Sequence, residues 1–285
     1  MSTPPQCNAF PTLAIAVKAQ DSPDHLSWAL ANDFALEYSP DQTAFGLLPV
    51  HLGPAIQAGV PVRFHGRYFG QEIGHPDTRI SESAMKIHLE TLYAMDRKCE
   101  PVVTFHLDLS WNDPFDPEKA VNNLSVLVNA AKRYGITVCI ENLRAGAASH
   151  PENILAWAEA SGASITLDVG HAISCQRVQK GELSVTDFID LFDDRLAEVH
   201  IYGYEADRHY PVTDARQFEP IITRLLQTSC RWWTIELEDR DEALSTRRLL
   251  KDCMSKAVSS FSCPAAGFVL PDCCLSGQPA AEARV

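Results

Sequence analysis

The stretch TVCIENLRAGAASHPENILAWAEASGASITLDVGH (residues 137–171) contains one complete strand–helix–strand unit. A β-branched run, TVCIE, is followed by a helix that Pro151 opens and Gly162 ends, and a second apolar run, SITLD, comes next. Both runs are almost continuously apolar, which is typical of parallel strands that are covered on both faces. The unit therefore predicts an α/β protein with a parallel sheet.

The same alternation of strand and helix is repeated along most of the chain. The strand candidates are residues 13–19, 34–39, 60–65, 101–109, 137–143, 163–169, 196–204 and 231–238. Amphipathic stretches such as 81–99, 116–135 and 241–254 lie between them, whereas 40–59 is too rich in Pro and Gly to predict a clean helix. Eight such units predict a single (β/α)8 TIM barrel over residues 10–256, followed by an irregular Cys/Pro/Ala-containing tail at 257–285.

The composition narrows the classes of partner and compartment. The formal net charge of −13 opposes attraction to nucleic-acid phosphates. No apolar run approaches the roughly 20 residues that span a bilayer, and the first residues do not resemble a secretion signal, so we expect a cytoplasmic protein. The cysteines are scattered and mostly inside apolar runs, which indicates buried free thiols.

Ligand-type side chains recur where the predicted strands end. In a TIM barrel these ends meet at one mouth, where catalytic residues gather. Packing does not require His, Asp or Glu there, and an unpartnered buried carboxylate would cost several kcal/mol. The sequence therefore predicts a multi-metal site formed by His65, His106, Glu141, Asp168, His171, His200, Asp207, His209 and Glu236.

Four further polar side chains are candidates for contact with a substrate. Lys18 and Glu37 lie at the ends of the first two strands, which carry none of the nine ligand-type residues. Arg67 and Tyr68 follow the His65 strand and place a cation and an aromatic ring beside the first ligand. We expect these four residues to bind substrate, although an ordinary surface or packing role fits the same positions.

The barrel region resembles the xylose-isomerase-like TIM-barrel superfamily, which includes the endonuclease IV family. The stretches that carry the resemblance are FHGRY (64–68), TFH (104–106), IENLRAG (140–146), LDVGHA (167–172), EVHIYGY (198–204), DRH (207–209) and IELE (235–238). The resemblance implies up to three metal ions, most often zinc. It implies a first ion on His65, His106 and Glu141, a second on Glu141, Asp168, His200 and Glu236, and a third on His171, Asp207 and His209.

The resemblance and the ligand set favour a metal-dependent hydrolase, a phosphodiesterase of endonuclease IV type in which Glu141 and Glu236 are catalytic. Three departures from the endonuclease pattern point to a small or non-DNA phosphodiester. They are HLD at 106–108, LRAGAAS at 143–149 and a short segment between His200 and Asp207. One superfamily branch cuts the nucleotide-loop phosphodiester of cobamides, which makes that bond a candidate substrate.

The alternative function is a sugar or sugar-phosphate isomerase or epimerase. Such relatives hold one Mn, Mg or Co ion on residues that correspond to Glu141, Asp168, His200 and Glu236. The two glutamates would then act as acid and base beside a carbonyl, and His171 would bind the substrate. A metal-stabilised binding barrel ranks last, because a structural site normally closes with four ligands and does not line an open mouth.

Overall fold

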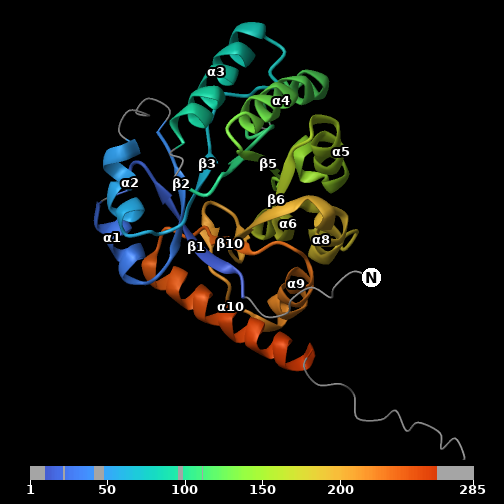
Figure 1. Cartoon of the computed structure of the whole chain (residues 1–285). Coiled ribbons are helices and arrows are strands. Elements are labelled where there is room, and N and C mark those ends of the chain that lie inside the picture. Colours follow the sequence, from blue (N-terminus) through green and yellow to red (C-terminus); the bar gives the residue numbers. More distant parts are fainter. Residues whose placement is uncertain (1–9, 22, 42–47, 96–98, 111, 262–285) are drawn as a thin grey trace, which may run out of the picture.

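The computed structural model describes residues 10–21, 23–41, 48–95, 99–110 and 112–261. Eight parallel strands form a closed barrel in the order β1-β10-β7-β6-β5-β4-β3-β2 (Figure 1). Their bounds are β1 Thr12–Lys18, β2 Ala35–Ser39, β3 Val62–Gly66, β4 Val102–Phe105, β5 Thr137–Glu141, β6 Ser164–Asp168, β7 Leu196–Ile201 and β10 Trp232–Ile235. Each barrel strand overlaps one strand candidate, so the predicted TIM barrel is confirmed.

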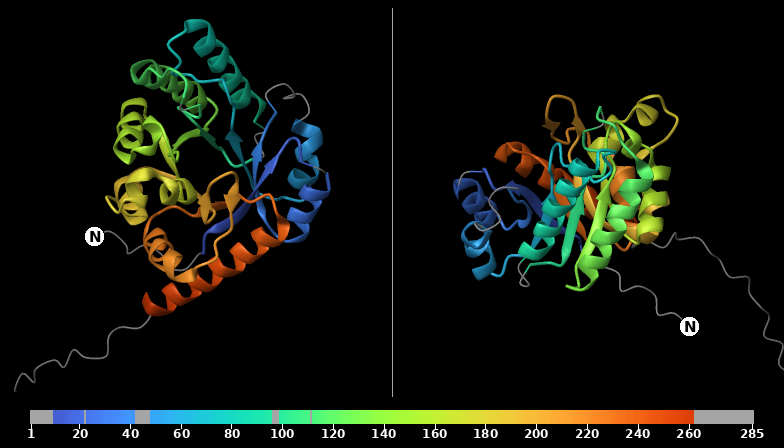
Figure 2. Two further views of the ribbon diagram at one scale, coloured as in Figure 1. Left: turned by 180° about the vertical axis from the view of Figure 1, so that it is seen from behind. Right: turned by 90° about the horizontal axis from the view of Figure 1, so that it is seen from above.

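Helices surround the barrel, as the views in Figures 1 and 2 show. They are α1 Pro23–Ala31, α2 Leu48–Gln57, α3 Thr78–Ala94, α4 Pro117–Lys132, α5 Pro151–Ser161, α6 Val169–Ser174, α7 Gln176–Gln179, α8 Val185–Phe192, α9 Ala215–Gln227 and α10 Arg240–Phe261. The 3-10 turns η2 (Ala147–Ser149) and η3 (Asp193–Arg195) precede α5 and β7. A two-stranded hairpin of β8 (Tyr204–Glu205) and β9 (His209–Tyr210) follows β7.

The predicted helix signals at α4 and α5 are present in the structure. Asp116 caps α4 by accepting a hydrogen bond from the Lys119 N–H at 3.1 Å, and Pro117 occupies the first turn. Gly162 ends α5 in the left-handed conformation, with φ of 76°, which is unfavourable for a side chain with a Cβ atom. These residues therefore mark where α4 begins and where α5 ends.

The expectation that residues 40–59 lack a clean helix was wrong for their second half. Residues Leu48–Gln57 form α2 although Pro54 lies inside it. A proline at this place removes one backbone hydrogen bond and disfavours the helix. The same helix places Leu52 and Ala55 in the core, where both are almost completely buried. This burial of apolar surface offsets the loss.

The C-terminal boundary also differs from the expected one. Helix α10 continues to Phe261, past residue 256, where the tail was expected to begin. The remainder of the predicted tail, with Cys263, Cys273 and Cys274, lies outside the described residues, as does Cys7. The buried free thiols that the sequence predicted are confirmed at Cys99, Cys139, Cys175, Cys230 and Cys253.

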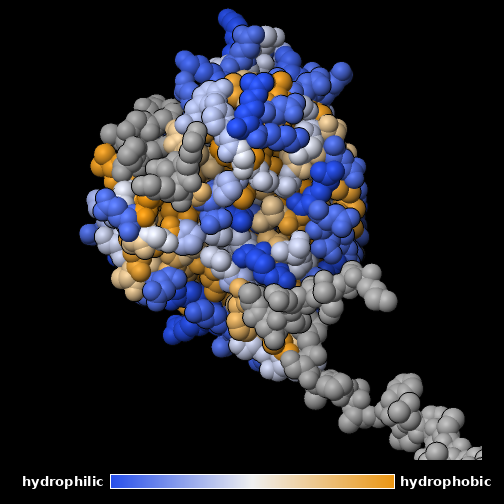
Figure 3. Space-filling model, in the orientation of Figure 1, coloured by the Kyte–Doolittle hydropathy of each residue, from blue (hydrophilic) through white to orange (hydrophobic). Residues whose placement is uncertain are grey.

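On the face seen in Figure 3, hydrophilic residues are interspersed with apolar ones. Among the described residues, every helix is too short or too polar to cross a lipid bilayer.

The interior of the barrel is polar directly below the ligand-type residues. Arg63 and Glu198 each lie two positions before a histidine on the same strand, His65 on β3 and His200 on β7. Their side chains form an ion pair at 3.3 Å, with Glu198 fully buried. Burial raises the pKa of Glu198 to about 7, with a further contribution from Glu37. This pair lies next to the predicted ligands, because Oε1 of Glu198 is 3.9 Å from Nε2 of His200.

Candidate metal centre

The predicted ligands lie at the C-terminal end of the barrel. His65, Glu141, Asp168 and His200 lie in β3, β5, β6 and β7, and Asp168 also begins α6. His106 and Glu236 directly follow β4 and β10, and His171 lies in α6. These seven side chains are at most 8% exposed. The barrel therefore concentrates seven ionisable side chains in a region with little solvent access.

The first ligand group is made of His65, His106 and Glu141. The Nε2 atoms of the two histidines lie 3.4 Å apart. Oε2 of Glu141 lies 3.2 Å from Nε2 of His65 and 3.0 Å from Nε2 of His106. Ligand atoms that surround a zinc ion tetrahedrally, with bonds of about 2.0 Å, are about 3.3 Å apart. The three atoms therefore have the spacing of ligands around one ion.

The second ligand group is made of Glu141, Asp168, His200 and Glu236. Nδ1 of His200 lies 3.3 Å from Oε1 of Glu141 and 3.5 Å from Oε1 of Glu236. Glu141 thus turns its two carboxylate oxygens toward different groups. This is the geometry that a shared ligand requires.

Several buried polar atoms of these two groups lack a well-oriented hydrogen bond to any described residue. They include both carboxylate oxygens of Glu141, Oδ2 of Asp168 and Nδ1 of His200. The other oxygen of Asp168 accepts a hydrogen bond from the His171 N–H at 2.6 Å. Buried polar groups are normally satisfied, so the unsatisfied atoms and the His/carboxylate donor set both fit divalent cations.

The third ligand group differs from the one implied by the resemblance. The structure brings together His171, Glu205 and His209. Asp207 lies at the exposed tip of the β8–β9 hairpin, where it accepts a hydrogen bond from the Tyr210 hydroxyl at 2.8 Å. Glu205 was missed by the sequence interpretation, because a two-residue strand is too short to show which of its side chains faces inward.

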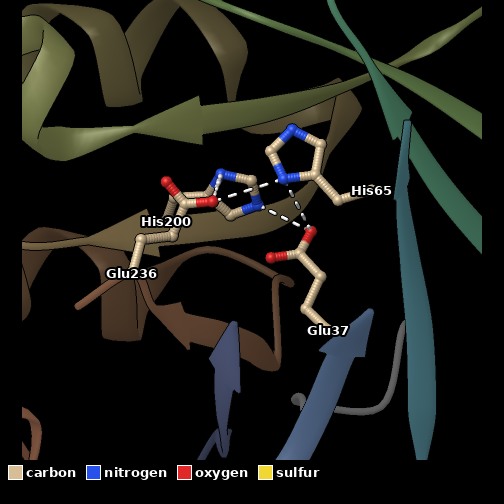
Figure 4. A group of neighbouring side chains, drawn as sticks. All are labelled: Glu37, His65, His200 and Glu236. Atoms are coloured by element: carbon tan, nitrogen blue, oxygen red, sulfur yellow. Dashed lines mark hydrogen bonds and ion pairs between the residues drawn. The ribbon is translucent and has the colours of Figure 1, made fainter. Parts of the chain in front are cut away.

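Glu37 is a second residue that lies elsewhere than expected. The sequence interpretation placed it toward substrate, but its side chain is fully buried. Its Oε1 lies 2.9 Å from Nε2 of His200 and 3.8 Å from Nδ1 of His65 (Figure 4). With Glu236 these residues form a further group of potential ligand atoms. Glu37 therefore contacts the ligands themselves.

The electrostatics of the centre reflect the close packing of buried carboxylates and histidines. Burial alone would lower the pKa of His65, but Glu37, Glu141 and Glu236 raise it to about 10. The pKa of His200 is likewise raised well above its usual value against the effect of burial. Burial raises the pKa of Asp168 well above its usual value. Bound divalent ions would take over the charge compensation that these protons provide.

A cavity of about 500 Å³ lies at the mouth and is lined by Lys18, Arg67, His209 and Glu236, among others. A smaller cavity of about 130 Å³ shares Arg67 with it and reaches His106 and Glu141. The Arg67 guanidinium stacks on the Phe69 ring at 5.2 Å, and Lys18 forms an ion pair with Glu238 at the rim. Of the four predicted substrate-binding residues, Lys18 and Arg67 therefore line the mouth.

Tyr68 is not brought to the mouth. Its side chain is only 4% exposed, and its hydroxyl lies 2.6 Å from Oγ1 of Thr91 in α3. Its ring packs edge-on against His88 at 5.4 Å. Tyr68 thus packs between the barrel and α3.

Comparison with known proteins places these observations in a family. The family described as xylose isomerase-like TIM barrel matches residues 55–253. The uncharacterized protein MJ0008 of Methanocaldococcus jannaschii is 36% identical over 151 residues, which are 53% of this chain and 65% of that protein. The match thus spans less than two thirds of that relative.

Two solved structures share the fold. A D-tagatose 3-epimerase-like protein superposes with a TM-score of 0.70 at 15% identity, over 88% of this chain and all of the other. Endonuclease IV from Thermus thermophilus superposes with a TM-score of 0.65 at 16% identity, over 86% of this chain and all of the other. The structures that share the fold therefore include both an endonuclease and a sugar-epimerase-like protein. The chain belongs to the xylose isomerase-like TIM-barrel family.

Proposed function

We propose that this protein is a metal-dependent hydrolase that cleaves a small phosphodiester. The observation that carries the proposal is the clustering of several ligand groups around Glu141. Its Oε2 faces His65 and His106, and its Oε1 faces His200 and, at 3.6 Å, Nδ1 of His171. Multinuclear sites of this kind suit displacement at phosphorus, where charge develops on both the attacking and the leaving oxygen.

The side chains at the mouth have distinct tasks in such a reaction. Divalent ions would supply Lewis acidity and positive charge for the attack of water on the phosphodiester. Glu141 and Glu236 would hold the ligand groups at a fixed separation through their carboxylates. Arg67 has no carboxylate partner within the described part of the chain. Its guanidinium would bind a non-bridging phosphate oxygen and orient the substrate.

The charge distribution favours a small substrate over a nucleic acid. The chain has a net charge of −13, and the mouth is lined by Asp21 and Glu238 as well as by cations. A long polyanion would meet repulsion outside the mouth, whereas one phosphodiester can reach Arg67 and the ligand groups. A cobamide nucleotide-loop phosphodiester fits this description and is one substrate to test.

A sugar isomerase or epimerase is the second candidate. The group of Glu141, Asp168, His200 and Glu236 would serve a single ion, with the two glutamates as acid and base. The fold shared with a D-tagatose 3-epimerase-like protein supports this candidate. It leaves the His171, Glu205 and His209 group without a role in metal binding.

Metal content and substrate turnover distinguish the two candidates. For the hydrolase we expect about three tightly held ions per chain, with losses in His65→Ala and His209→Ala. Purified protein loaded with zinc or manganese would be assayed in parallel on bis(p-nitrophenyl) phosphate, a cobamide and several ketoses. One ion per chain, unchanged in both variants, together with turnover of ketoses alone, would overturn the hydrolase proposal and support the epimerase.

A further inference from the structure

The β8–β9 hairpin holds Glu205 over the mouth in a fixed register. Glu205 pairs directly with His209 across the two strands. The backbone N–H of Glu205 donates to Oγ of Ser174 at 2.8 Å, which ties the hairpin to α6. At the base, a Cβ atom on Gly203 would lie 2.3 Å from the Pro211 carbonyl oxygen, so only glycine permits this close approach. The backbone therefore fixes where the Glu205 side chain leaves the hairpin.

The two histidines beside Glu205 have fixed tautomers. Nδ1 of His171 lies 2.9 Å from the carbonyl oxygen of Asn142, and Nδ1 of His209 lies 2.9 Å from that of Glu236. A carbonyl oxygen only accepts, so each Nδ1 donates its proton. When the ring is neutral, each Nε2 then carries a lone pair. Backbone carbonyls fix metal-binding histidines in this way in many proteins.

The Glu205 carboxylate and Nε2 of His171 are separated by the distance expected for two ligand atoms of one ion. Oε2 of Glu205 is 3.2 Å from Nε2 of His171, close to the separation of about 3.3 Å between tetrahedral zinc ligands. His209 is held in the same small cluster, because its ring stacks on that of Tyr202 with centroids 3.8 Å apart. Arg144 also approaches Glu205 Oε2, at 3.2 Å between nitrogen and oxygen.

Asp207 is held away from this cluster by contacts of its own. It accepts a hydrogen bond from the Tyr210 hydroxyl, and Tyr210 stacks on Tyr204 with centroids 4.7 Å apart. The adjacent Arg208 pairs with Glu242 of α10 at 2.6 Å. Bringing Asp207 to the histidines would require these contacts at the hairpin tip to break.

We propose that Glu205, in place of Asp207, is the carboxylate ligand that binds a divalent ion together with His171 and His209. The proposal rests on the proposed function only in assuming a divalent ion at the barrel mouth, and it holds for either reaction. The carboxylate would then come from Glu205 on the first strand of the hairpin, and not from Asp207 of the DRH stretch at 207–209.

Two isosteric substitutions test the proposal against each other. Glu205→Gln and Asp207→Asn each remove one carboxylate without changing the size of the side chain. Both variants and the parent chain would be equilibrated at buffered free zinc concentrations, and bound zinc per chain measured by mass spectrometry. We expect Glu205→Gln to lower the affinity for one zinc ion by roughly 10-fold to 100-fold or more. We expect Asp207→Asn to bind zinc with the affinity of the parent chain.

A third variant, Glu205→Asp, and a circular dichroism spectrum separate the loss of a ligand from the loss of the fold. Glu205→Asp retains the charge but shortens the side chain. Its affinity for the ion at His171 and His209 should therefore lie between those of the parent chain and Glu205→Gln. The far-UV circular dichroism spectrum of each variant would establish that the barrel is intact. Loss of the ion in Asp207→Asn, or equal binding in both isosteric variants, would overturn the proposal. Absence of phosphodiester cleavage by the parent chain, with the expected zinc results, would reject the hydrolase alone.

Discussion

His200 and Glu37 are joined inside the barrel by a contact of 2.9 Å between Nε2 and Oε1, and both side chains are fully buried. The other ring nitrogen of His200 faces Glu141 and Glu236. Glu37 therefore holds a proton on Nε2, so Nδ1 is the ring nitrogen that would bind an ion, in the manner of a carboxylate–histidine–metal arrangement. A residue on β2 thus determines how a ligand on β7 presents itself.

Replacing Glu37 should weaken metal binding without removing a ligand of the Glu141 group. In Glu37→Gln the amide can still contact Nε2, but it no longer selects the tautomer or raises the basicity of the ring. We expect the affinity for one ion to fall by roughly 10-fold to 100-fold, measured by competition with a chromogenic chelator. The matched control is Glu238→Gln at the rim, whose side chain is 84% exposed. An unchanged affinity in Glu37→Gln would contradict this role.

Glu141→Gln should remove ions from two ligand groups at once and abolish activity. The substitution takes away one of the two oxygens that face His65, His106 and His200 and weakens the other. Metal analysis should therefore show a larger loss than in His65→Ala, which affects one group of the hydrolase arrangement. Circular dichroism should still report a folded barrel. A loss no larger than that in His65→Ala would show that the carboxylate is not shared.

Chelation should destabilise the protein. Four carboxylates at the centre, Glu37, Glu141, Asp168 and Glu236, are at most 8% exposed. An ion present at 1,000 times its dissociation constant stabilises the native state by about 4 kcal/mol. For a chain of this size we expect EDTA to lower Tm by about 10 °C or more. Added zinc should restore Tm, and the Glu141→Gln variant should respond less to both treatments.

Arg67 should act on substrate binding rather than on metal content. Its guanidinium lines both mouth cavities and stacks on Phe69. In Arg67→Ala we expect kcat/KM for an anionic phosphodiester to fall by roughly 10-fold to 100-fold with bound zinc unchanged, since a charge-assisted hydrogen bond contributes about 1.5–3 kcal/mol. Arg79→Ala, which removes a side chain that is 90% exposed at the start of α3, is the control. Equal kinetics in both variants would remove Arg67 from the proposed reaction.

Stability should decrease in acid because of His88 in α3, whose ring packs against Phe105 with centroids 4.6 Å apart. Burial lowers the pKa of His88 to about 4 from an ordinary value of 6.5. Its Nδ1 donates to the carbonyl of Ala84 at 2.7 Å. The folded pKa lies below the unfolded one, so the unfolded chain binds the proton first as pH falls. The stabilisation is therefore complete above about pH 6.5 and lost progressively toward pH 4.

The size of this effect can be measured by substitution. At about 1.4 kcal/mol per pKa unit, His88 accounts for about 3 kcal/mol of the loss between pH 7 and pH 4. Denaturant unfolding with EDTA present throughout should show that His88→Leu loses less stability over this range than the parent chain. Parallel pH dependences of the two proteins would contradict the assignment.

The fold could be predicted from sequence because each unit carries its own local signals. The run TVCIE, the proline that opens α5 and the glycine that ends it act within a few residues of where they stand. The barrel then follows, because parallel strands joined by helices have few ways to close. Helix α2 was not foreseen, because the burial of Leu52 and Ala55 that offsets Pro54 depends on the rest of the barrel.

The site was less predictable where side-chain direction decides the role. Glu37, Glu205 and Asp207 are all acidic residues near strand ends, and the sequence does not distinguish them by chemistry. Glu37 points into the barrel because it alternates with Leu36 and Tyr38 along β2. Glu205 faces inward and Asp207 outward because of the turn that joins β8 and β9. Only the register of that hairpin determines which carboxylate meets the histidines.

The two oxygens of Glu141 have a consequence for how divalent ions would bind at the centre. Because one carboxylate faces two ligand groups, an ion in either group would reorient and polarise a ligand of the other, so the two binding equilibria would be coupled. Thermodynamic reciprocity requires that each ion change the affinity for its neighbour by the same factor, whichever enters first. We therefore expect a metal titration of this protein to depart from a sum of independent isotherms. Its shape measures the cooperativity that a single shared side chain imposes on the centre.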